Sequence, residues 1–188
     1  MTKGKTLIFE GSIQSAKRDP NDPNKIIIDV RSEPFGKDPP FAAGFYDAIG
    51  RLVVTWGKFE HHLDTILHTL VEVAAQHGIS EKVPHAFQKK ADVFRRIYQD
   101  CPPLAPLKDW ADTLMSEAEL LGKDRNRIIH STVNNWGKGD PPTIQLKSYE
   151  FQKKQWSLRE INATKEDIAK LADKADQLNT RLLGYRPR

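Results

Sequence analysis

Hydrophobic positions past Pro40 recur with helical spacing. From Ile49 to Ala74 the apolar residues alternate steps of four and three, which is typical of a helix with one buried face. This pattern predicts a first long helix that ends near Gly78. Its expected buried seam consists of Ile49, Val53, Trp56, Glu60, Leu63, Leu67, Leu70 and Ala74.

Two further helices are predicted in the middle of the chain. One spans about residues 81–100, where two consecutive prolines end it because proline lacks the backbone N–H that a helix needs. Its inward residues are expected to be Val83, Phe87, Ala91, Phe94 and Tyr98. The next helix spans about residues 106–132, with the seam Leu107, Trp110, Leu114, Ala118, Leu121, Arg125, Ile128 and Thr132.

The C-terminal part of the chain predicts a β-hairpin followed by a last helix. Segments 143–150 and 155–161 have alternating character around a short polar turn, which is typical of a hairpin. Thr164, with Asp167 three residues later, forms a capping pair for a helix that ends at Gly184. Four amphipathic helices with short connections predict a mainly α fold, a four-helix bundle with a small hairpin near residues 143–161.

The first 40 residues are expected to be an N-terminal extension, and residues 41–188 the helical domain. Apolar islands at 6–13 and 25–30 flank a turn-forming cluster at 17–23, which predicts a strand pair. A length of 188 residues suits one domain with an appendage of this kind.

Composition restricts the class of protein. No apolar run approaches the roughly 20 residues that cross a bilayer, so we expect no membrane association. The N-terminal apolar run at residues 7–9 is too short for a secretory signal, and a single cysteine, Cys101, excludes an internal disulfide. These features predict a cytoplasmic protein. The net charge of +4 favours an anionic partner only mildly.

The residues with the clearest chemistry lie near the end of the third predicted helix. Arg125, Asn126, Arg127 and His130 place two guanidiniums, an amide and an imidazole within about two helical turns. A guanidinium is a planar fork for phosphate oxygens, and an imidazole both accepts and donates protons near neutral pH. Asn126 and Arg127 share the face of His130, whereas Arg125 lies about 140° round the axis.

Lys123 and Asn134 are expected to extend this polar face as substrate-binding donors. The alternative is a solvated helix face that carries a lone histidine. Glu60 and Arg125 are the charged members of two buried seams, so we expect them to meet, because isolated ions are disfavoured in a low dielectric. Such a carboxylate either orients the guanidinium for a phosphate or ties the bundle together.

Arg125-Asn126 followed by three residues and His130-Ser131 resembles the signature of the HEPN superfamily. These helical-bundle proteins include many prokaryotic ribonucleases of toxin and antiphage systems. The position of the motif late in a long helix is similar to the family pattern, as are Trp56 and Glu60 in the first helix. The resemblance covers about residues 41–135 and leaves the extension and the hairpin unexplained.

The resemblance implies a homodimer in which two motifs form one composite, metal-independent site that cleaves RNA without a cofactor. In that site His130 would be the general base or acid, Arg125 would stabilise the phosphate, and Asn126 would orient His130 or the phosphate. Arg127 is a further cation that would bind the substrate, and it would be the phosphate ligand in place of Arg125 if Glu60 holds Arg125. An antitoxin protein is a partner that the family suggests. Some members keep the bundle and do not cut RNA, so the alternative is a non-catalytic dimeric helical module that binds a protein or nucleotide.

A metal site is a third reading. His61, Asp64 and His68 fall near one face of the first helix, with His62 adjacent. No other helix offers an obvious matching set of ligands, so a solvated surface is the favoured interpretation of these residues.

Overall fold

The computed structural model describes residues 12–19, 22–31, 38–152 and 155–184. The chain divides into two compact units, Met1–Pro39 and Pro40–Arg188. In the first unit, β1 (Ser12–Asp19) pairs antiparallel with β2 (Asp22–Arg31). The strand expected at residues 6–13 lies mostly outside the described residues, and residues 17–19 and 22–23, which the sequence predicts to be part of a turn, belong to β1 and β2.

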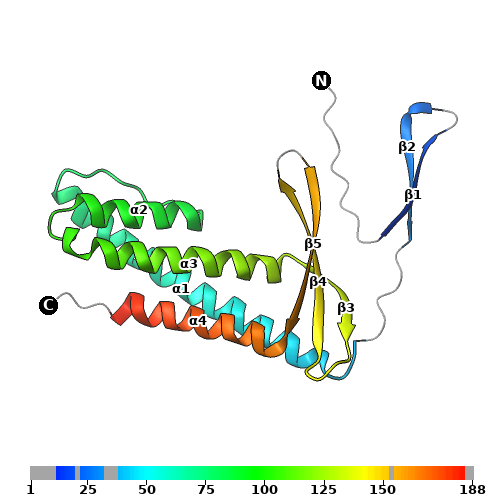
Figure 1. Cartoon of the computed structure of the whole chain (residues 1–188). Coiled ribbons are helices and arrows are strands. Elements are labelled where there is room, and N and C mark those ends of the chain that lie inside the picture. The colour runs from blue at the N-terminus through cyan, green and yellow to red at the C-terminus, as the bar shows by residue number, and fades with distance from the viewer. Residues whose placement is uncertain (1–11, 20–21, 32–37, 153–154, 185–188) are drawn as a thin grey trace. The chain divides into compact units, whose positions relative to one another are not determined.

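The second unit is mainly helical, as expected (Figure 1). Its helices are α1 (Ala42–Gln76), α2 (Phe87–Asp100), a 3₁₀ turn η1 (Ala105–Leu107), α3 (Lys108–Ile129) and α4 (Lys165–Gly184). Its antiparallel sheet has the order β3 (Thr132–Gly137), β4 (Thr143–Gln152) and β5 (Gln155–Thr164). In the described part of the chain no helix combines the length and apolar character needed to cross a membrane.

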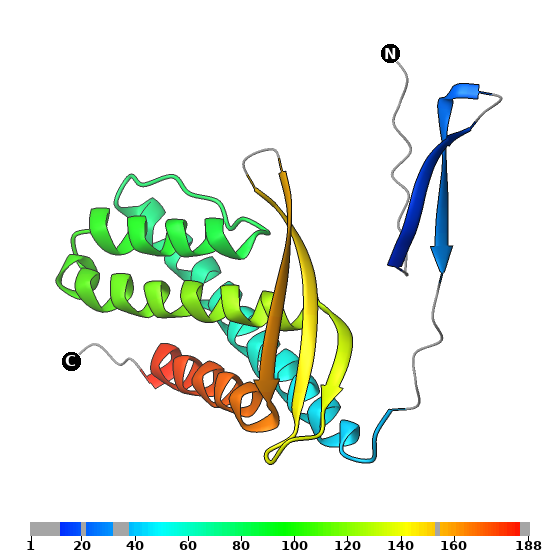
Figure 2. The ribbon, with the colours of Figure 1, turned by 45° about the vertical axis from the view of Figure 1, so that its right-hand side comes forward.

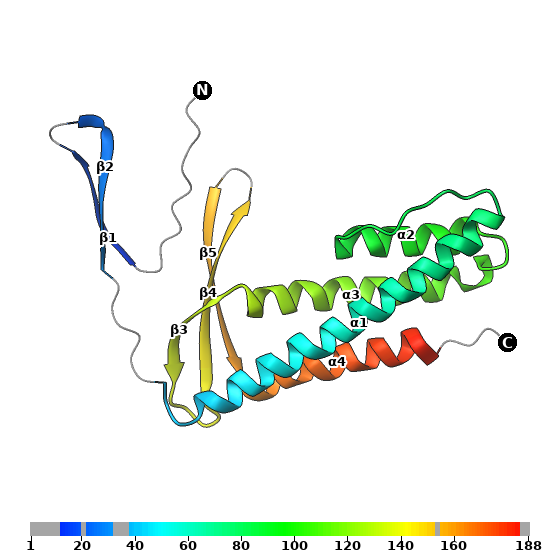
Figure 3. The ribbon, with the colours of Figure 1, turned by 180° about the vertical axis from the view of Figure 1, so that it is seen from behind.

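The long helix α1 connects two hydrophobic clusters. Its N-terminal half runs beside α4 and meets the sheet, and its C-terminal half packs with α2 and α3, as Figures 1 and 3 show from opposite sides. The larger cluster lies among the four helices, and the smaller lies where α1, α4 and the end of α3 meet the sheet. The sheet therefore covers the end of the helical layer at which α3 ends.

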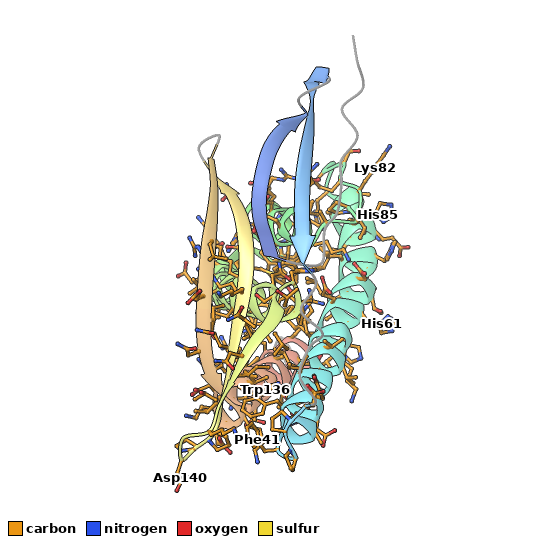
Figure 4. The ribbon with its side chains drawn as sticks, turned by 90° about the vertical axis from the view of Figure 1, so that its right-hand side faces the viewer. Phe41, His61, Lys82, His85, Trp136 and Asp140 are labelled. Carbon is orange, nitrogen blue, oxygen red and sulfur yellow. The ribbon has the colours of Figure 1, made fainter. Side chains whose placement is uncertain are left out.

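Aromatic rings close the small cluster at the N-terminal end of α1. The Trp136 ring on β3 lies 5.6 Å from Phe45 and 5.9 Å from Phe41, measured between ring centroids. Figure 4 shows Phe41 and Trp136 near one end of the helical layer, far from Lys82 and His85 at the other end. Edge-to-face contacts of this kind add to the stabilisation from burial, so they anchor β3 to α1.

The predicted seam of α1 is wrong in its N-terminal half. Leu52 and Phe59 are fully buried, whereas Val53 is 41% exposed and Ile49 is only half-buried. Both sets of residues have helical spacing, and they converge at Trp56. Periodicity alone could not choose between them, because the sheet and α4, which cover this half of α1, come from distant parts of the sequence.

The close approach of α1 and α3 depends on a glycine. Gly122 of α3 is buried, and a Cβ atom at this position would lie 3.0 Å from Cη2 of Trp56. The Trp56 ring also meets Phe87 at the start of α2, with ring centroids 5.0 Å apart. Three helices therefore converge one turn before the motif on α3.

Two helix boundaries differ from the prediction. The second helix begins at Phe87 instead of near residue 81, because Pro84 disfavours the helical conformation of the residue before it and Ala86 is extended, with ψ 131°. The third helix ends at Ile129, and Thr132 is the exposed first residue of β3. The predicted hairpin is confirmed, but it is part of a three-stranded sheet, because Val133 and Trp136 pack into the small cluster.

Ion pairs join the helices away from the motif. Nζ of the buried Lys90 in α2 lies 2.6 Å from Oδ1 of Asp64 in α1. Arg95 in α2 donates to Glu119 in α3 at 2.6 Å, which raises the pKa of Arg95 and lowers that of Glu119. These contacts fix α2 against both of its neighbours.

The capping pair at the start of α4 has the predicted geometry. The backbone N–H of Asp167 donates to Oγ1 of Thr164 at 3.1 Å, and the N–H of Thr164 donates to Oδ2 of Asp167 at 3.1 Å. The Thr164 hydroxyl donates to the same carboxylate at 2.7 Å, and these hydrogen bonds from Thr164 hold the pKa of Asp167 below its ordinary value.

Replacing this carboxylate should lower stability in a pH-dependent way. A lowered folded-state pKa adds stability above the unfolded pKa of about 3.9, and that stability is lost as the pH falls through the folded value. Asp167→Asn should therefore reduce the free energy of unfolding by about 0.3–1 kcal/mol at pH 7. In urea titrations the difference from the unaltered chain should be constant at neutral pH and should shrink as the pH falls below about 4. A pH-independent difference would contradict this, and Asp176→Asn, an exposed position within α4, is the control.

Candidate functional site

His130 lies at the C-terminal end of α3 with its side chain open to solvent. It is the C-cap residue, with φ −100° and ψ 8°, and its backbone N–H donates to the carbonyl of Asn126 at 3.0 Å. The residue is exposed, and its ring makes no hydrogen bond or ion pair with any described residue. The last turn of α3 therefore fixes the backbone of this residue while its side chain makes no polar contact with the described residues.

Arg125 is half-buried on a different side of the same helix. Burial lowers the pKa of its guanidinium from the ordinary value, and the charge of Glu60 opposes that change. The expected ion pair between Glu60 and Arg125 does not form, since no nitrogen–oxygen distance between these two described residues is within 4.0 Å. Glu60 acts on Arg125 only through its charge at longer range. Nε of Arg125 is buried without a hydrogen-bond partner among the described residues.

Asn126 holds the outer end of this guanidinium. Nη1 of Arg125 donates to Oδ1 of Asn126 at 2.8 Å. Since Asn126 lies one turn before His130 and shares its face, this hydrogen bond draws the guanidinium round the helix toward the side of the imidazole. Among the described contacts, the side-chain oxygen of Asn126 thus accepts a hydrogen bond from Arg125.

Arg127 is the second guanidinium of the motif. It is exposed, and its Nη1 lies 3.0 Å from Oδ1 of Asp124 in an i,i+3 ion pair on the same helix. Arg127 precedes His130 by three residues, which is about 4.5 Å along the helix axis. Arg127 therefore lies near the imidazole of His130, and the carboxylate of Asp124 partly neutralises its charge.

Lys123 and Asn134, the other two predicted substrate-binding residues, have different outcomes. Lys123 is exposed on α3, seven residues before His130 and so on the same face. Asn134 does not extend that face, because it lies in β3 and donates to Oε1 of Gln145 on β4 at 2.7 Å. The prediction of a helix that continues to residue 132 is the source of this error.

Asp64 and the adjacent His62, two of the residues considered as metal ligands on α1, are engaged in other contacts. Nδ1 of His62 hydrogen-bonds with Oδ1 of Asn179 on α4 at 2.7 Å, and Asp64 pairs with the buried Lys90. Within the described residues, no three His, Cys, Asp or Glu side chains gather closely enough to hold a metal ion. Cys101 is buried.

A groove with a volume of about 580 Å³ lies beside the motif, between the end of α3, β5 and the first half of α4. Figure 2 shows these three elements side by side. The apolar residues that line the groove are Ile128, Ile161, Ala163, Ile168 and Leu171. The polar residues that line it are Asp124, Arg127, Arg159, Glu160, Asn162, Asp167, Lys170 and Lys174.

Sequence reasoning did not identify Lys170 and Lys174 as neighbours of the motif. The signal available was two lysines four residues apart beside the apolar seam of the last helix. More than 40 residues separate them from Arg127 in the sequence, and only the packing of α4 under α3 brings them together. Comparisons with protein-family models, with curated proteins and with solved structures give no match for this chain.

Proposed function

We propose that this protein is a metal-independent endoribonuclease of the HEPN type that acts as a homodimer. The observation that supports this most directly is the exposure of His130 at the end of α3, together with the guanidinium of Arg125 that Asn126 holds toward the same face. The combination matches the needs of phosphodiester cleavage, a group that exchanges protons and a cation that stabilises phosphate charge.

The reaction is a transphosphorylation within the RNA. One imidazole removes the proton of a ribose 2′-hydroxyl, and the oxygen attacks the adjacent phosphorus. The bond to the 5′-oxygen breaks, and a protonated imidazole gives that oxygen its proton. The products are a 2′,3′-cyclic phosphate and a 5′-hydroxyl. Arg125 stabilises the extra negative charge on the phosphate oxygens at the point of attack.

A second copy of the chain completes the site in this proposal. The reaction uses a base and an acid at once, and each chain brings one imidazole to this face of α3 among its described residues. Two chains related by a two-fold axis would supply both groups, as the HEPN resemblance implies. The same resemblance suggests a role in a toxin or antiphage system, with an antitoxin protein as a further partner.

The roles of the two arginines follow from their surroundings. Arg127 is already paired with Asp124, whereas Nη2 of Arg125 has no such partner among the described residues. We therefore propose that Arg125 binds the phosphate at the point of cleavage. Asn126 positions Arg125, and Lys123 adds positive charge on the same face.

Cleavage should be independent of divalent metal. The purified chain, incubated with a single-stranded RNA in excess EDTA, should cut at the rate seen without EDTA and leave 2′,3′-cyclic phosphate ends, because the nucleophile is the 2′-oxygen. A single 2′-deoxy substitution at the point of cleavage should stop the cut there. Cleavage that EDTA abolishes would instead favour a metal hydrolase and would contradict the proposal.

The same experiment distinguishes a ribonuclease from a non-catalytic helical module that only binds a partner. A dimer that binds RNA, a nucleotide or a protein without cutting RNA under any of these conditions would be a non-catalytic helical module. The chain arrangement is measured independently by sedimentation, and a monomer that cleaves at full rate would contradict the composite site.

A further inference from the structure

We propose that the groove between α3, β5 and α4 binds one nucleotide of a single-stranded RNA next to the cleavage point. The inference rests on the proposed function and adds the substrate class, namely RNA whose bases are unpaired. Sequence-tolerant recognition of such RNA combines cationic groups for the backbone with a surface that receives a base.

The groove has the size and the lining for a base and its sugar. Its volume of about 580 Å³ falls within the roughly 300–1,000 Å³ typical of small-ligand pockets. The apolar side chains of Ile128, Ile161 and Leu171 come from three different elements, so the surface that they form is held by the fold. Asn162 on β5 is exposed and also lines the groove.

Positive charge on the α4 side of the groove suits a phosphate backbone. Lys170 and Lys174 lie one helical turn apart, about 6 Å along the axis. Lys174 forms no ion pair with any described residue, and Nζ of Lys170 lies 3.9 Å from Oδ1 of Asp167, a long contact. Both ammonium groups can therefore approach a phosphate at little cost in existing contacts.

The carboxylates of the groove are engaged by neighbouring residues. Asp124 pairs with Arg127, and Nζ of Lys147 lies 2.9 Å from Oε1 of Glu160. Asp167 accepts the hydrogen bonds of the α4 cap from Thr164. These contacts reduce the repulsion that an incoming phosphate would meet at the rim.

The groove is continuous with the catalytic face through Arg127. This residue lines the groove and lies three residues before His130 on the same helix. A strand of RNA whose phosphate is held between Arg125 and His130 could therefore pass Arg127 and place the neighbouring nucleotide in the groove. The lysines of α4 would then contact the next phosphate.

Binding is measured with a fluorescent 2′-O-methyl RNA, which cannot be cleaved because its 2′-oxygens carry no proton. The Lys170→Ala/Lys174→Ala double variant should bind the single strand at least tenfold more weakly at low salt. Its plot of log affinity against log salt should be shallower by about 0.7, since the two lysines contact the same phosphate and each lost phosphate contact contributes about 0.7. The matched control is Lys58→Ala/Lys89→Ala, exposed lysines on α1 and α2 that form no ion pair with the described residues.

The outcomes separate the two proposals. If the groove variant binds the single strand like the control, the groove assignment is overturned, while cleavage in EDTA would leave the nuclease proposal intact. If the groove variant binds weakly but the unaltered chain cuts no RNA, the groove stands and the nuclease proposal falls. A strand of equal length without bases that binds as tightly as the full strand would also overturn the groove assignment, since it would show that only phosphates are bound.

Discussion

His130→Ala is expected to lower the rate of RNA cleavage by about 10²–10⁴-fold, the range that a positioned acid–base group contributes. In a two-fold dimer the substitution removes both imidazoles, so the loss should lie toward the upper end. The measurement is the initial rate on a single-stranded RNA at saturating concentration, with EDTA present.

The same substitution should leave the fold unchanged. The His130 ring is exposed and makes no hydrogen bond or ion pair with the described residues, so its removal breaks no described contact of this kind. Exposed substitutions of this kind usually change stability by less than about 0.5 kcal/mol. The Tm and the sedimentation coefficient should therefore match those of the unaltered chain.

His68→Ala is the matched control for this prediction. His68 is also an exposed histidine without a described partner, but it lies on α1 and belongs to the rival metal site. It should cleave at the full rate. Loss of cleavage in His68→Ala with full activity in His130→Ala would reverse the assignment and favour a metal hydrolase.

Leu52→Ala is expected to destabilise the fold by about 2–5 kcal/mol, the cost of removing a buried leucine and leaving a cavity. Leu52 is fully buried in the small cluster, where α1, α4, the end of α3 and the sheet meet. The free energy of unfolding is measured by urea titration, with circular dichroism at a helical wavelength.

Val53→Ala, one residue further along, is the control. Its side chain is 41% exposed, and alanine has the higher helix propensity, so the change should stay within about 0.5 kcal/mol. The periodicity of the sequence predicts the opposite ranking, with Val53 buried. A large loss in Val53→Ala and a small one in Leu52→Ala would show that α1 has the register predicted from the sequence.

Local patterns predicted most of the elements of the helical unit. Amphipathic spacing located all four helices, and the Thr164–Asp167 pair located the start of α4 because a cap depends on neighbouring residues. Prediction from local spacing failed where contacts between residues far apart in the sequence override the local preference for a helix. Helical spacing continues through Thr132, which predicted a longer helix. In the structure the chain leaves the helix at Ile129, and burial of Val133 and Trp136 in the small cluster stabilises the strand that follows.

The residues of the candidate site were likewise predicted only where their placement depends on local sequence. The sequence by itself determined that Arg125, Asn126, Arg127 and His130 lie together near the end of one helix, because residues three to five apart on a helix are neighbours whatever surrounds them. Only the tertiary structure decided that His130 is open to solvent, that Glu60 attracts Arg125 without pairing with it, and that α4 and β5 form a groove beside Arg127. Burial and long-range contacts depend on how distant segments pack, and helical periodicity carries no information about that packing.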